Sequence, residues 1–235
     1  MNKGKAYGVS VGPGDGMLIT LEAINTIKMA DIVFLPSAPK EDCKAYIIIK
    51  QSIPEIDDMD LRCETFTMSR DSNVMSDRHD EIFRNICPLL DEGKNIVFLA
   101  LGEVSLYSTY LYIHDRLVRA GYSSSLISGI SSVQAISAKL GIGMALGSTE
   151  LHIFPDTDNI ETKLKYNGTR VFMKPKGDMS LIVSKIKDYV KTHDGVIACG
   201  ISNCGMEGEK IARSVDELDI LSGYFTVIFV CLEKA

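Results

Sequence analysis

Short apolar, β-branched runs that alternate with longer amphipathic runs constrain the fold of this chain more than any other feature. The run Tyr7–Val11 leads through a glycine-rich turn into a helix, which the spacing of leucines and isoleucines predicts over residues 16–30. The apolar run at residues 95–101 and the run Ser125–Ser128 lead through further glycine turns into helices. Strands that alternate with helices are typical of an α/β protein with a parallel sheet.

The pattern changes after about residue 150, where short strands outnumber helices. One helix is expected over residues 179–192. Strands are expected around it at Leu151–Phe154, Arg170–Lys174, Val196–Ile201 and Phe225–Leu232. We therefore expect two α/β domains, an N-terminal domain of residues 1–130 with the glycine-rich loops and a C-terminal domain of residues 131–235.

Composition and charge restrict the function. The net charge of −6 over 235 residues argues against nucleic-acid binding, which needs a surplus of Lys and Arg on one face. The apolar stretch Tyr224–Leu232 is far shorter than the roughly 20 residues of a membrane helix, and the amino terminus is a poor signal peptide. The six cysteines form no CxxC pair, and neither they nor the four dispersed histidines suggest a protein-bound metal. A soluble, cytoplasmic protein with no membrane or nucleic-acid partner is expected.

The first glycine turn reads Gly12-Pro13-Gly14-Asp15-Gly16 and is not built for an anion. It lacks the third glycine of GxGxxG and has no Gly-Lys-Ser/Thr. Asp15 would also repel a phosphate at that position. A dinucleotide oxidoreductase is therefore disfavoured, whereas a cationic ligand is compatible with the turn. Asp15 is either the N-cap of the following helix or a catalytic carboxylate.

Four stretches taken together resemble the tetrapyrrole methylases. GVSVGPGDGMLITLEA is similar to the opening motif of that family, and FLALGEVSLYST is similar to its second motif. SGISS looks like a third turn, and GTRVFMK looks like a strand near the start of the second domain. The size and the helix after the second motif are most similar to the members that methylate C-20 of precorrin-2 or its cobalt form in cobalamin (vitamin B12) biosynthesis.

The resemblance implies a class III methyltransferase fold, two α/β domains with S-adenosylmethionine in the cleft between them, and a homodimer. It implies Asp15 as the catalytic residue that removes the substrate proton. It also implies that the methyl donor contacts the second turn, the third turn and one residue of the second domain: Gly102, Glu103, Val104, Ser105, Tyr107, Ser131, Ser132 and Met173. The sulfonium cation of the donor suits turns that carry carboxylates.

Two departures from the family's motifs bear on these expectations. Gly16 stands where the family usually has proline, which leaves the first loop freer. Glu103-Val104 replaces Asp-Pro in the second turn, so the side chain is longer and residue 104 regains a backbone N–H, which is expected to loosen the turn. These changes leave open a protein that binds a tetrapyrrole without catalysis, as well as other activities of the family.

The substrate implied by the resemblance is cobalt-factor II or metal-free precorrin-2, with any cobalt carried by the substrate. Arg70, Arg78 and Lys176 are candidates for its carboxylates, although each is also typical of a solvated surface charge. The polar, irregular residues 53–78 are expected to form a flexible lid.

Overall fold

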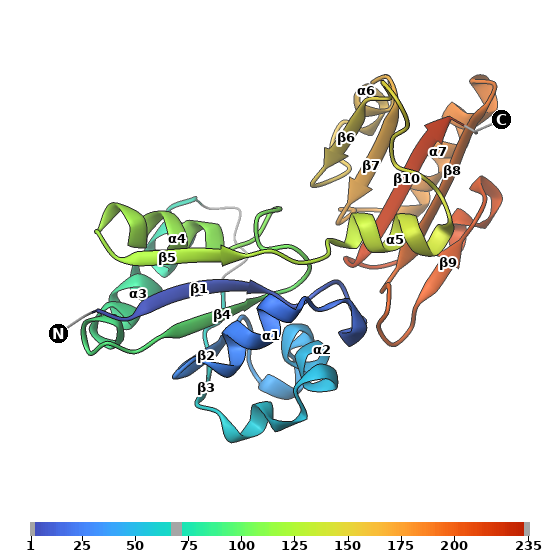
Figure 1. The fold of residues 1–235 in the computed structure, drawn as a ribbon. Helices are drawn as coiled ribbons and strands as arrows, with labels where there is room; N and C mark the ends of the chain where they lie inside the picture. Colours follow the sequence, from blue (N-terminus) through green and yellow to red (C-terminus); the bar gives the residue numbers. More distant parts are fainter. Residues whose placement is uncertain (1–2, 67–71, 233–235) are drawn as a thin grey trace. The chain divides into compact units, whose positions relative to one another are not determined.

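The computed structural model describes residues 3–66 and 72–232. The chain divides into two compact units, residues 1–131 and 132–235. Each unit contains one five-stranded sheet with helices packed against it (Figure 1). The expected α/β fold is therefore confirmed.

The sheet of the first unit is parallel throughout, in the order β3-β2-β4-β1-β5. Its strands are β1 (Lys5–Ser10), β2 (Ile32–Leu35), β3 (Leu61–Cys63), β4 (Ile96–Ala100) and β5 (Ser123–Ile127). Since parallel strands end at the same edge of a sheet, the glycine turns after β1, β4 and β5 share one edge, where open α/β sheets bind ligands.

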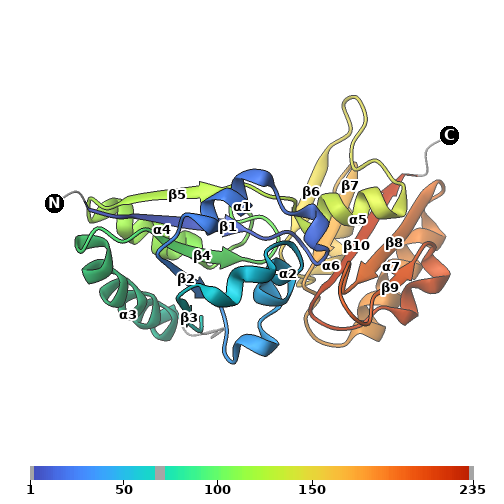
Figure 2. The same ribbon diagram turned by 60° about the horizontal axis from the view of Figure 1, so that its bottom comes forward.

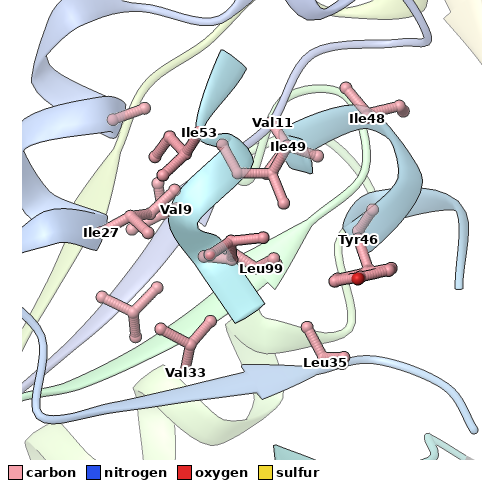
Figure 3. Packing of buried hydrophobic residues seen from close by; sticks show 14 of the residues in the cluster. Val9, Val11, Ile27, Val33, Leu35, Tyr46, Ile48, Ile49, Ile53 and Leu99 are labelled. Atoms are coloured by element: carbon pink, nitrogen blue, oxygen red, sulfur yellow. The ribbon is translucent and has the colours of Figure 1, made fainter. Parts of the chain in front are cut away.

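Helices cover both faces of this sheet. Alternate residues of a strand point to opposite faces, so Val97 and Leu99 of β4 lie in one core while Ile96 and Phe98 lie in the other. The first core is closed by α1 and α2 and appears in Figure 3; the second is closed by α3 and α4. These helices are α1 (Leu21–Lys28), α2 (Lys44–Ser52), α3 (Ser72–Asp91) and α4 (Tyr110–Arg119), and short 3-10 turns lie at Gly16–Leu18, Lys40–Asp42 and Pro54–Asp58.

The predicted helix over residues 16–30 is wrong in detail. Asp15 begins a 3-10 turn at Gly16–Leu18, and α1 starts only at Leu21. Ile19 and Thr20 separate the two. The extended backbone of Ile19 ends the first turn. The hydroxyl of Thr20 accepts a hydrogen bond from the N–H of Ala23 at 3.2 Å and caps α1.

The irregular structure expected of residues 53–78 is corrected, whereas the lid itself stays a prediction. Residues 53–66 contain a 3-10 turn and strand β3, and α3 begins at Ser72. Arg70 lies outside the described residues, so its expected role in binding a substrate carboxylate stays a prediction. The helix expected from Ser105 begins five residues later, at Tyr110.

The second unit has a mostly antiparallel sheet in the order β6-β7-β10-β8-β9, with β6 and β7 parallel. Figures 1 and 2 show α5 on one face of this sheet and α7 on the other. Its elements are α5 (Ser132–Leu140), β6 (Leu151–Phe154), α6 (Ile160–Leu164), β7 (Thr169–Met173), α7 (Met179–Thr192), β8 (Val196–Ser202), β9 (Lys210–Ala212), a 3-10 turn (Val215–Ile220) and β10 (Thr226–Leu232).

The helices and the possible metal ligands in residues 3–66 and 72–232 bear on the expected partners. None of the helices there has both the length and the apolar character that a bilayer crossing requires. Within the same ranges, His, Cys, Asp and Glu side chains form no group of three or more able to hold a metal ion.

Candidate functional site

The first and second glycine turns are joined by backbone hydrogen bonds. The N–H of Val11 donates to the carbonyl of Ala100 at 2.9 Å, which extends the pairing of β1 with β4 by one residue. The N–H of Gly102 then donates to the carbonyl of Gly12 at 2.8 Å. Gly12 and Gly102 have φ of +80° and +76°, a left-handed conformation that glycine adopts without strain. Both turns therefore start from a fixed backbone position.

Asp15 is exposed and caps the 3-10 turn that follows it. Its Oδ1 accepts a hydrogen bond from the N–H of Met17 at 2.9 Å, and its second oxygen has no hydrogen-bond partner among the described residues. The next residue, Gly16, is tied to α2: its N–H donates to Oε1 of Gln51 at 3.0 Å, and its carbonyl accepts from the hydroxyl of Ser52 at 2.7 Å. The expectation that Gly16 leaves this loop freer is therefore wrong, because α2 holds both the N–H and the carbonyl of Gly16.

The carboxylate of Glu103 connects the second turn to the third. Its Oε1 accepts from the N–H and the hydroxyl of Ser105 at 2.9 and 2.7 Å. Its Oε2 accepts from the hydroxyl of Ser128 at 3.0 Å and from the N–H of Gly129 at 2.5 Å. Burial alone would raise the pKa of Glu103, but these hydrogen bonds outweigh it and hold the pKa below its ordinary value. The carboxylate is therefore charged and already engaged by the protein.

Val104 does not loosen the second turn. Its side chain is fully buried, and its N–H donates to the hydroxyl of Ser10 at 2.9 Å. Ser10 is also fully buried, and its hydroxyl donates to the carbonyl of Ile127 at 2.9 Å. One serine thus joins β1, the second turn and the end of β5, and the N–H that proline would lack has a partner.

Space and backbone strain mark the second turn as a place for a ligand. A Cβ added to Gly102 would meet no heavy atom within 4 Å. Tyr107 has φ of +52°, an unfavourable conformation for a non-glycine residue, and its side chain is 43% exposed. Strain of this kind concentrates at functional sites. The open side of Gly102 therefore suits the close approach of a ligand to the backbone.

The remaining candidates divide between the two units. Ser131 is buried at the end of the third turn, and Ser132 is the first residue of α5. Met173 is the last residue of β7 in the second unit, where it is buried and pairs with Val227. The structure thus ties the second turn to the first and third, while the expected role of Met173 at the same site stays a prediction.

The candidates for binding the substrate's carboxylates differ in availability. Arg78 has partners on all three guanidinium nitrogens, namely Glu64, Glu81 and the carbonyl of Thr65. Lys176 is exposed. Sequence analysis missed Ser10, because its partners Ile127 and Val104 are far from it in the chain.

The turns fit S-adenosylmethionine on two grounds. The segments 10–16, 100–107 and 127–132 contain no Lys, Arg or His, so no positive side chain in them opposes a sulfonium cation. The exposed Asp15 carboxylate and the open side of Gly102 offer it negative charge and backbone contact.

A domain family described as Tetrapyrrole (Corrin/Porphyrin) Methylases matches residues 5–219. Since this match spans most of the chain, the chain belongs to the tetrapyrrole methylase family. The resemblance drawn from the four sequence stretches is confirmed.

Curated relatives and solved structures agree with this assignment. The chain is 29% identical over 217 residues to a probable cobalt-precorrin-2 C(20)-methyltransferase of Methanocaldococcus jannaschii, covering 92% of this chain and 90% of the relative. It is 26% identical to the cobalt-precorrin-2 C(20)-methyltransferase of Salmonella typhimurium, covering 97% and 96%. A putative cobalamin synthesis related protein (CobF) from Corynebacterium diphtheriae shares the fold with a TM-score of 0.72 at 18% identity, covering 98% and 99%.

Proposed function

We propose that this chain is an S-adenosylmethionine-dependent methyltransferase that methylates C-20 of cobalt-factor II (cobalt-precorrin-2) in cobalamin biosynthesis. The observation that carries the proposal is the joined pair of turns, in which the backbone of Gly102 is held by a hydrogen bond and a Cβ added to it would meet no heavy atom within 4 Å. The names of the two C(20)-methyltransferase relatives support the choice of substrate. The alternative within the same chemistry is metal-free precorrin-2.

The methyl donor is proposed to bind along the second and third turns. Gly102, Val104 and Ser105 would offer backbone groups, and Tyr107, Ser131, Ser132 and Met173 would line its remaining surface. Glu103 would act indirectly, because its oxygens already accept hydrogen bonds from Ser105, Ser128 and Gly129. When bound, the donor supplies an electrophilic methyl group on a positively charged sulfur.

The contribution of the chain to the reaction is then alignment and proton removal. Holding the carbon nucleophile in line with the methyl group lowers the barrier by roughly 7–11 kcal/mol in well-oriented systems. The methylated carbon must lose a proton, and Asp15 is the proposed acceptor, because its second carboxylate oxygen has no other described partner.

We also propose that the protein is a cytoplasmic homodimer, as the family resemblance implies. The acceptor's carboxylates call for cationic groups or backbone N–H donors near the site. Lys176 remains one candidate, and Arg78 is less available because carboxylates already pair with it.

A parallel anaerobic incubation tests the proposal. The purified protein and S-adenosylmethionine are mixed with cobalt-factor II in one tube and with precorrin-2 in another, and products are read by mass spectrometry. Gain of one methyl group in the cobalt tube supports the proposal, and gain only in the other tube moves the assignment to the metal-free substrate. Donor binding without any gain would contradict the methyltransferase activity on both substrates and favour a binding role.

A further inference from the structure

Lys174 follows the last residue of β7 and has an unfavourable backbone conformation. Its φ is +47°, in the left-handed region where a non-glycine residue is uncommon. The conformation is fixed because the N–H of Lys174 donates to the carbonyl of Thr226 at 3.1 Å. Strained residues of this kind persist where the surrounding structure enforces them and where function benefits.

The side chain of Lys174 is half-buried without a carboxylate partner among the described residues. Its Nζ lies 5.8 Å from the centre of the Tyr224 ring. Burial lowers the pKa of Lys174, and the nearby positive charge of Lys176 lowers it further. The charged group acting on this ammonium is therefore another cation.

The other half-buried lysines of the second unit show how unusual this is. Among its described lysines, Lys163, Lys185 and Lys187 are buried to a similar degree. They pair with Asp156, Glu161 and Asp219 respectively. Lys174 is the member of this group that has no such pair in the described chain. A half-buried ammonium without a counter-ion is suited to an anionic ligand, because charge-assisted hydrogen bonds strengthen when water is partly excluded.

We propose that Lys174 binds a carboxylate of one of the two reactants. This inference rests on the proposed function, which supplies two carboxylates of the same chemistry: those on the tetrapyrrole periphery and the one on the amino-acid part of the methyl donor. Lys176 adds positive charge to the same segment but is exposed, and it lies near enough to Asp156 to lower the pKa of that carboxyl.

The variant Lys174→Asn provides the test. Asparagine has no charge but tolerates a left-handed backbone, so the variant should fold and melt at or above the temperature of the native protein. Lys165→Asn is the matched control, because Lys165 is an exposed lysine at the C-cap of α6, outside the proposed site. Binding of three probes is measured by titration: S-adenosylhomocysteine, 5′-methylthioadenosine (which lacks the amino-acid carboxylate) and uroporphyrin.

Loss of one charge-assisted contact should raise a dissociation constant about tenfold or more. A rise for S-adenosylhomocysteine but not for 5′-methylthioadenosine assigns Lys174 to the donor carboxylate, and a rise for uroporphyrin alone assigns it to the acceptor. Equal binding of all three probes by native protein and Lys174→Asn overturns the inference and leaves the proposed function standing. Equal losses in both lysine variants also overturn it, as does a loss that accompanies a lowered melting temperature. Failure of the native protein to bind either carboxylate probe overturns the proposed function and this inference with it.

Discussion

At the scale of single residues, Asp15 combines a structural and a chemical role. One oxygen caps the 3-10 turn and the other has no described partner. Asp15→Ala should therefore reduce methyl transfer by about 100-fold or more, the usual contribution of a general base. Donor binding should fall far less, because an exposed carboxylate attracts the sulfonium cation only weakly in water. Asp15→Asn keeps an oxygen that can cap but cannot accept the proton, so the same loss of rate is expected with less effect on stability. Initial rates and donor titrations check both variants; an active Asp15→Asn would reduce Asp15 to a cap.

The stability that the Glu103 carboxylate contributes should depend on pH. Its pKa is lower in the folded chain than its ordinary value of 4.5, so the stability it adds is present above that value and is lost as pH falls through the folded pKa. Glu103→Gln turns an NH₂ group toward N–H donors and should cost about 1–3 kcal/mol at pH 7. Denaturant unfolding at pH 7 and pH 3 should show this gap closing at low pH. A gap that does not depend on pH would mean that the charge of Glu103 is unimportant.

A side chain introduced at Gly102 should block binding of the methyl donor without preventing folding. Its φ of +76° makes a leucine costly by about 1–2 kcal/mol, but the added Cβ meets no heavy atom within 4 Å. Gly102→Leu should fold and lose donor binding, and Gly102→Ala should lie between it and the native protein. Donor titration together with a melting curve checks this. Native-like donor affinity in Gly102→Leu would move the binding site elsewhere.

The residue types of the site were readable from the sequence, but some of their contacts were not. The glycine turns and Asp15 follow directly from short motifs. The partners of Glu103 and Ser10 come from segments that only the sheet brings together, so a motif cannot indicate them. Lys174 was missed because nothing in its sequence neighbourhood reports the left-handed backbone or the absent counter-ion.

At the scale of elements, the first loop and α2 act as one piece. A Cβ at Gly16 would lie 2.8 Å from Cβ of Gln51 and 2.8 Å from the hydroxyl oxygen of Ser52. Gly16→Ala should therefore destabilise the chain by about 1–3 kcal/mol and displace the neighbouring Asp15. Gln51→Gly should cost less stability in the Gly16→Ala background than in the native protein, because in that background it also removes one clashing side chain. Denaturant unfolding of the single and double variants measures this coupling, and strictly additive effects would contradict it.

Strands were easier to predict than helices. The apolar run Ile32–Leu35 matches an observed strand, because a buried strand needs little beyond such a run. The predicted helix over residues 16–30 ignored Ile19 and Thr20, whose extended backbone breaks it in two. Helix α2 was not predicted, because its isoleucines are consecutive and do not show the spacing of an amphipathic helix.

At the scale of the whole molecule, the proposed homodimer is a prediction about mass in solution. Light scattering after size-exclusion chromatography should give twice the 25.8 kDa of one chain. Dilution into the micromolar range and below should leave the mass unchanged if the interface is an obligate one. A mass of one chain throughout would contradict the dimer.

The strand order of the first sheet has a consequence for co-translational folding. β1 is made first, yet it lies between β4 and β5, and Ala6 pairs with Ile96. At synthesis rates of about 5–20 residues per second, β1 must wait on the order of 5–20 seconds for its first neighbour. During that interval its buried edge and its glycine turn have no native partner, so the nascent chain passes through a stage that needs protection from premature association.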